Sequence, residues 1–148
     1  MSRDVYHEMF MHFIWHIKAG LTPMSEEMQQ DVYKTVRRRA LEPGGLYVHE
    51  IGGTENHVHM VVRVRPTLLI SEWIGRVKGG SAHDINEMDR WRKRLQWQTG
   101  YGIVCFGESN LVWVKRYVQS QKEHHANGTA VDRLERTDSP DGDGSSQE

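Results

Sequence analysis

The stretch His-Val-His-Met-Val-Val-Arg-Val-Arg, residues 57–65, decides the fold because apolar and polar side chains alternate along it. One side of an extended strand would carry the apolar residues Val58, Met60, Val62 and Val64. The other side would carry His57, His59, Arg63 and Arg65, with Val61 between the histidines and the arginines. A period of two is typical of a half-buried β-strand. The pattern predicts a strand with a core on one face and polar chemistry on the other.

The segments around this strand predict the order β-α-β-β-α-β-α. Residues 9–18, 46–51 and 102–107 have strand character, and the short link 52–56 predicts a hairpin into residues 57–65. A first helix is expected from Pro23 to about residue 41, with Thr22 as its cap. A second helix follows residues 66–67, with an interruption at Gly79-Gly80. A third runs from residue 111 to about residue 125.

The first six elements predict an α+β fold, a ferredoxin-like β-α-β-β-α-β sandwich with an antiparallel sheet plus a C-terminal helix. Right-handed crossovers would place the first two helices on one face of the sheet, with the first and third strands adjacent in its centre. His57 and His59 should then lie on the opposite face, with His12 or His16 of the first strand nearby.

The whole chain indicates one domain of residues 1–130, followed by an acidic and disordered tail of residues 131–148. The sequence has no run of 18 apolar residues, so no membrane span or membrane partner is expected. The single cysteine, Cys105, cannot form an internal disulfide, which favours a reducing compartment such as the cytoplasm. Because Cys105 lies in an apolar run, we expect it to be buried and inert.

The net charge of −1 hides local basic clusters, because six acidic residues and only two basic ones lie after position 131. Basic patches on the rest of the chain allow contact with a polyanion. The candidates for phosphate contact are Arg63, Arg65, Lys78 and Arg116. A solvated helix face explains Lys78 and Arg116 equally well.

Two pairs of residues could carry chemistry on the polar face. His57 and His59 would project to the same side of a strand, roughly 7 Å apart at Cα, which suits two imidazoles on one divalent metal. Tyr117 and Gln121 are four apart and share a helix face, offering a hydroxyl nucleophile and an amide ligand. The alternative is that these residues have no catalytic role: the histidines face solvent, the tyrosine is half-buried and the glutamine is solvated.

Four motifs resemble those of one family. His57-Val58-His59 is similar to the His-hydrophobe-His motif of HUH nucleases. Trp-Gln-Thr-Gly-Tyr-Gly at 97–102, and Tyr-Val-Gln-Ser-Gln-Lys-Glu-His-His at 117–125, resemble the C-terminal half of the small single-tyrosine transposases of insertion sequences. Lys-Gly-Gly-Ser at 78–81 resembles their Lys-Gly-x-Ser element. The resemblance covers nearly the whole ordered chain.

The resemblance implies a mechanism residue by residue. His57, His59 and Gln121 would bind Mg²⁺ or Mn²⁺, and Tyr117 would attack a DNA phosphodiester to form a 5′-phosphotyrosine. The family acts on single-stranded DNA with hairpins near the ends of the element, and its members are homodimers with composite active sites. Asn56 departs from the aspartate found in many relatives, so the partner of His57 would be altered.

Two other functions remain open on the sequence. A related replication or mobilisation nuclease would share the histidine motif and the tyrosine helix, but would not need the Trp-Gln-x-Gly-Tyr-Gly element. A non-catalytic nucleic-acid-binding module would use the face of a four-stranded sheet, where such proteins display aromatic residues. Histidine and arginine on residues 57–65 count against that reading.

Overall fold

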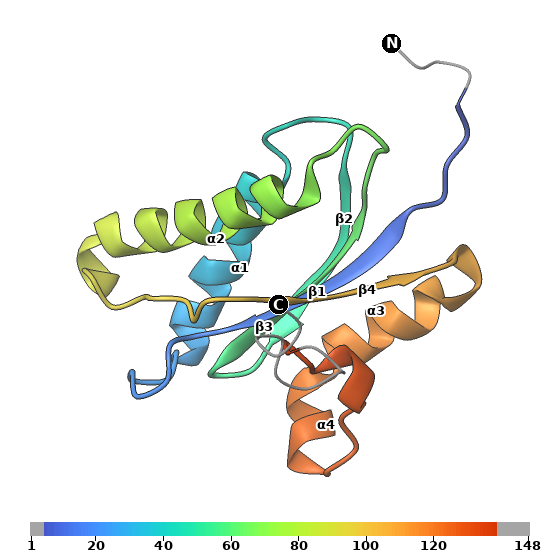
Figure 1. Cartoon of the computed structure of the whole chain (residues 1–148). Coiled ribbons are helices and arrows are strands. Elements are labelled where there is room, and N and C mark those ends of the chain that lie inside the picture. The colour runs from blue at the N-terminus through green and yellow to red at the C-terminus, as the bar shows by residue number, and fades with distance from the viewer. Residues whose placement is uncertain (1–4, 139–148) are drawn as a thin grey trace, which may run out of the picture.

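A computed structural model describes residues 5–138 and has the predicted α+β architecture (Figure 1). The elements follow the order β1 (Phe10–His16), α1 (Glu26–Ala40), β2 (Tyr47–Gly53), β3 (His57–Arg63), α2 (Ile70–Glu87), β4 (Gly102–Phe106), α3 (Leu111–Gln119) and α4 (Gln121–Ala126). Within the described part of the chain, no helix is long and apolar enough to cross a membrane.

The four strands form one antiparallel sheet in the order β2-β3-β1-β4, so the predicted central pair of β1 and β3 is confirmed. The β1–β3 register places His16 opposite His57. Helices α1 and α2 pack together on one face of the sheet, and α3 lies on the other (Figure 1).

The alternation in β3 divides the two faces as expected. Its apolar residues enter the main core beneath α1 and α2, together with Phe13 and Trp15 of β1. Val61 points the other way and packs on Val114 and Val118 of α3. A Cβ at Gly52 would lie 2.5 Å from the Val118 carbonyl oxygen, so the missing side chain lets α3 approach β2 closely. These contacts fix the helix that carries Tyr117 against the sheet.

Several expected helix boundaries are wrong. The helix α1 begins at Glu26 rather than Pro23, because the Ser25 hydroxyl accepts a hydrogen bond from the Met28 N–H and provides the cap. The helix α2 continues through the two glycines at 79 and 80. A Cβ at Gly80 would lie 2.7 Å from Nε of Arg39, so the glycine allows the two helices to pack closely.

The third predicted helix is divided at Ser120 into α3 and α4. The Ser120 N–H contacts the carbonyl oxygens of both Arg116 and Tyr117, which is typical of a tightened last turn. Gln121 therefore begins a second short helix while staying one turn beyond Tyr117.

Cys105 is exposed, contrary to the prediction. Its apolar run forms β4, which is an edge strand that pairs only with β1. Ile103, two residues away on the same side, is also 39% exposed. An apolar run on an edge strand is not covered on both faces, and this explains the error.

The folded domain extends past the boundary expected at residue 130. Residues 129–136, which we call the C-terminal strap, include a single turn at Asp132–Leu134, and Leu134 is 4% exposed. A Cβ at Gly102 would lie 1.8 Å from the carbonyl oxygen of Arg136, so this glycine leaves room for the strap beside β4. The rest of the predicted tail, residues 139–148, lies outside the described residues.

Candidate active site

The polar face of the central strands carries a buried cluster of histidines. His57 and His59 are 2% and 0% exposed, and their ring centroids lie 4.9 Å apart. From β1, His16 stacks on His57 with centroids 5.0 Å apart, and Nε2 of His12 lies 2.6 Å from Nδ1 of His59. The topology predicted His12 or His16 near the pair, and the structure places both there.

The predicted helix residues lie directly over this cluster. Tyr117 is 2% exposed and its ring centroid lies 6.0 Å from that of His59. The side-chain oxygen of Gln121 lies 3.0 Å from Nε2 of His57. The structure therefore brings all four residues together within one chain.

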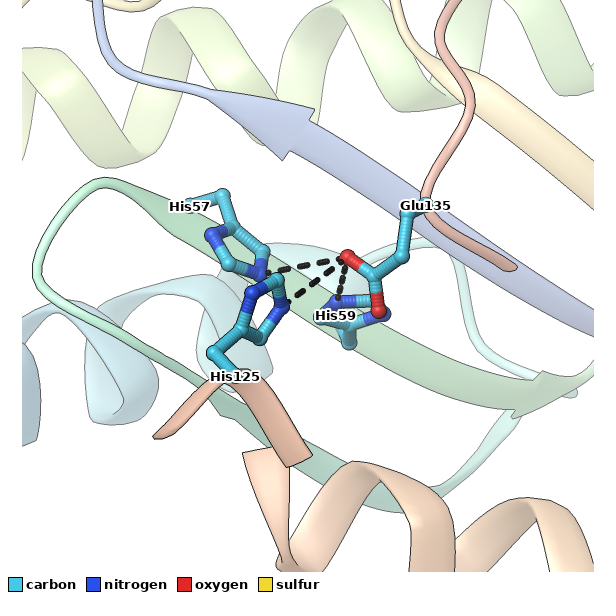
Figure 2. Close-up of side chains that lie close together, drawn as sticks. All are labelled: His57, His59, His125 and Glu135. Carbon is cyan, nitrogen blue, oxygen red and sulfur yellow. Dashed lines mark hydrogen bonds and ion pairs between the residues drawn. The ribbon is translucent and has the colours of Figure 1, made fainter. Parts of the chain in front are cut away.

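Sequence reasoning missed Glu135, which enters the cluster from the C-terminal strap (Figure 2). Its Oε1 atom lies 3.4, 3.2 and 3.3 Å from Nε2 of His57, His59 and His125 respectively. Its Oε2 atom accepts hydrogen bonds from the Tyr117 hydroxyl and, at 3.2 Å, from the side-chain amide of Gln121. One carboxylate thus joins the histidines to the tyrosine.

Burial and local contacts set the protonation states. Burial, and then the neighbouring His59, lower the pKa of His57 to about 3, so its imidazole is neutral near pH 7. Burial also lowers the pKa of His59, against the opposing effect of Glu135. For Glu135 burial opposes ionisation, but the contacts with His59 and Tyr117 outweigh it and lower the pKa to about 2. Burial, and then the bond to Glu135, raise the pKa of Tyr117 to about 12.

The partners of His57 reveal a conflict between hydrogen-bond acceptors. Its Nδ1 lies 2.7 Å from the side-chain oxygen of Asn56, so we assign the ring proton to Nδ1. The lone pair on Nε2 then faces the oxygen of Gln121, whose amide nitrogen is already directed at Glu135. If the Gln121 amide were turned round, its nitrogen could donate to Nε2 of His57. Its oxygen would then face the Glu135 carboxylate, so two acceptors would still face each other. A cation between these atoms removes the conflict, and imidazole and oxygen donors suit a divalent metal.

Asn56 takes the place of the expected aspartate and still provides a hydrogen-bond acceptor for His57. Its oxygen accepts from Nδ1 of His57, and the Thr54 hydroxyl lies 2.8 Å from the same nitrogen. An acceptor on Nδ1 directs the Nε2 lone pair toward the site, as metal-binding histidines require.

The predicted phosphate-contact residues lie at different places. Arg63 donates to the carbonyl oxygen of His7, and Arg65 donates to that of Gly44, away from the histidines, because β3 ends at Arg63. Lys78 donates to two carbonyl oxygens of the loop before β4, those of Gln98 and Gly100, at 2.9 and 2.6 Å. Arg116 is exposed on α3, next to Tyr117 in sequence.

Two aromatic rings lie close to the ring of Tyr117. Trp113 stacks on it with centroids 5.6 Å apart and an interplanar angle of 13°, and the centroid of His124 lies 4.7 Å away at an angle of 34°. Trp113 itself is 53% exposed, so an aromatic surface leads from solvent to the buried hydroxyl. The i, i+4 spacing of Trp113 and Tyr117 on one helix was the sequence signal for their contact.

Comparisons with known proteins identify similar sequences and similar folds. The family model described as "Transposase IS200 like" matches residues 5–121. The ISDra2 transposase TnpA of Deinococcus radiodurans is 24% identical over 128 residues, covering 82% of this chain and 90% of the relative.

Solved structures show the same fold. A Deinococcus radiodurans R1 crystal structure, described as a transposase, aligns with a TM-score of 0.62 at 19% identity, over 82% of this chain and 96% of the other. A REP-associated tyrosine transposase bound to a REP hairpin aligns with a TM-score of 0.60 at 10% identity, over 88% and 75% respectively.

Proposed function

Because the chain belongs to the family of IS200-like transposases, we propose that it cleaves and rejoins single-stranded DNA at insertion-sequence ends through a 5′-phosphotyrosine on Tyr117. The observation that carries the proposal is the Tyr117 hydroxyl beside the cluster of His57, His59 and Gln121, joined to it through Glu135. A buried hydroxyl and a convergent set of metal donors are the two components that such a reaction requires.

The proposed reaction exchanges one phosphate ester for another. The Tyr117 oxygen forms a bond to phosphorus, the bond from phosphorus to the 3′-oxygen breaks, and the phenolic proton ends on the released 3′-hydroxyl. A different 3′-hydroxyl then reverses the step and joins new ends without ATP. Because the pKa of Tyr117 is raised to about 12, the phenol is protonated near pH 7 and must lose its proton during attack.

The proposed metal ligands are His57, His59 and Gln121, holding Mg²⁺ or Mn²⁺. Nε2 of His57 lies 3.0 Å from the Gln121 side-chain oxygen, and the ligand atoms of His57 and His59 lie within 4.8 Å of each other. Neutral imidazoles and an amide oxygen are donors that suit a divalent cation. When bound, the cation would polarise the phosphoryl oxygens and stabilise the leaving 3′-oxygen.

We propose single-stranded DNA carrying a hairpin as the substrate, since a structural neighbour is bound to a REP hairpin. Arg116 and the exposed ring of Trp113 flank the nucleophile and would contact phosphate and base respectively. Arg63, Arg65 and Lys78 stay candidates for phosphate contact farther from the reacting atoms.

The direct test is a cleavage assay with labelled single-stranded DNA from the ends of the source element. With Mg²⁺ or Mn²⁺ the wild-type protein is expected to form a DNA adduct that survives a denaturing gel, and a chelator is expected to abolish it. Joined ends should appear when a second 3′-hydroxyl strand is added. A protein that cleaves but never joins would contradict the proposed strand transfer, and one that only binds would contradict catalysis.

We also propose a homodimer in which the tyrosine helix of one subunit can complete the site of the other. Light scattering should then give a mass near twice the 17.2 kDa of one chain. Mixing Tyr117→Phe with His57→Ala is expected to restore part of the activity if the site is shared, because one intact site then forms per heterodimer. Restoration is impossible if every site uses residues of a single chain.

The non-catalytic alternative receives no support from the sheet. Its face opposite α1 and α2 is packed against α3 through Val61, Val114 and Val118. A binding module of that kind needs this face accessible to bases.

A further inference from the structure

The metal donors predicted from the motifs carry no charge. His57 and His59 are neutral imidazoles, and Gln121 offers an amide oxygen. Mg²⁺ and Mn²⁺ are hard cations that favour carboxylate oxygens, and protein sites for them normally include at least one. Two imidazoles and one amide therefore leave such a cation without an anionic ligand from the protein.

Glu135 is the carboxylate of the metal-sized cluster formed in the described part of the chain. The ligand atoms of Glu135, His57, His59 and His125 all lie within 4.8 Å of one another, and the Glu135 side chain is 16% exposed. Its two oxygens divide their contacts: Oε1 faces the imidazole nitrogens, while Oε2 accepts from Tyr117 and Gln121. Oε1 can therefore bind a cation without loss of the Tyr117 hydrogen bond.

The strap is also held by contacts that do not involve the Glu135 carboxylate. Leu134 is buried beside it, and the N–H of Val131 donates to the Tyr117 oxygen at 2.8 Å. The N–H of Thr129 bonds to the His124 carbonyl oxygen at 2.8 Å, which ties the start of the strap to α4. Glu135 is thus placed by the fold, unlike a surface acid that reaches a site by chance.

From this geometry we infer that Glu135 is the anionic ligand of the divalent cation, supplied by the C-terminal strap, and that it also orients the Tyr117 hydroxyl. The inference rests on the proposed metal-dependent function and adds a ligand beyond the three motif residues. It makes metal binding and the docking of the strap interdependent, because each holds the same carboxylate.

The test is metal binding by the full chain without DNA. Titration with Mn²⁺, followed by the electron paramagnetic resonance signal of the free ion, is expected to show binding by wild type. Glu135→Gln should weaken it by roughly 10–100-fold or more, because even outer-shell partners of a metal contribute that much. The matched control is Asp132→Asn, which removes a charge from the same strap at an exposed position and should bind like wild type.

A second measurement covers the case in which Glu135→Gln loosens the strap. Hydrogen exchange of residues 129–136 in the wild-type protein should slow when Mn²⁺ is added, since the metal holds Glu135 in place. Unchanged exchange in the presence of bound Mn²⁺ would refute the ligand role.

The Mn²⁺ titration and the DNA assay together distinguish failure of the inference from failure of the proposed function. Equal Mn²⁺ affinity of wild type and Glu135→Gln excludes Glu135 as a ligand. Equal affinity with faster DNA cleavage by the variant would show instead that the strap only covers Tyr117. If wild type binds Mn²⁺ through Glu135 but forms no DNA adduct, the inference stands and the proposed function fails.

Discussion

Tyr117→Phe is expected to eliminate the covalent DNA adduct completely, because the phenyl ring has no oxygen to attack phosphorus. The substitution also removes the bonds to Glu135 and to the Val131 N–H. Leaving these buried partners without the hydroxyl should cost about 1–2 kcal/mol of folding stability, which a domain of this size tolerates. Denaturing gels measure the adduct, thermal melting measures the stability, and a gel shift checks that DNA binding is retained.

The matched control is Tyr33→Phe. Tyr33 is half-buried, its hydroxyl lies 3.4 Å from the Gln29 side-chain oxygen on α1, and burial raises its pKa to about 12, as for Tyr117. It lies on the helix that packs against the opposite face of the sheet. This variant should form the adduct at the wild-type level. An adduct that persists in Tyr117→Phe would assign the nucleophile to another residue.

The alternation in residues 57–65 predicted the fold and half of the site because a period of two is a local property of an extended chain. Which side chains share a face follows without any tertiary information. The topology then placed His12 and His16 next to the pair, since β1 and β3 had to be central neighbours. The helix spacing of Tyr117 and Gln121 is local in the same way, and the break at Ser120 does not disturb it.

Glu135 could not be found by such reasoning. It lies 76 residues from its contact His59, and the surrounding residues have the polar composition of a disordered segment. Its position depends on one buried leucine and on the space left by Gly102, which are tertiary features without a period. The prediction for Cys105 was wrong for a different reason. An apolar run was interpreted as buried, although a central pair of first and third strands leaves the fourth strand at an edge of the sheet.

Acid is expected to destabilise the metal-free protein strongly below about pH 6.5. Burial, and then His59, lower the pKa of His12 to about 3, and the pKa of His57 is also lowered to about 3. The unfolded chain binds protons at the ordinary value of 6.5 while the folded chain does not, so stability is present above pH 6.5 and is lost as pH falls toward 3. Going from about pH 7.5 to about pH 4.5 should cost about 3 kcal/mol for each of the two histidines.

Between pH 6.5 and 4.5 the pH dependence of stability reports on the histidines and not on Glu135. Its pKa is lowered to about 2, so its own contribution is lost only below the ordinary value of 4.5. Urea unfolding with a chelator present should therefore show a steep dependence of the unfolding free energy on pH in this window.

His12→Gln removes one buried titrating group and should reduce the slope of the unfolding free energy against pH by about 1.4 kcal/mol per pH unit. His83→Gln, at an exposed position on α2, should leave the slope unchanged. Equal slopes in wild type and His12→Gln would mean that His12 is not held neutral by the fold.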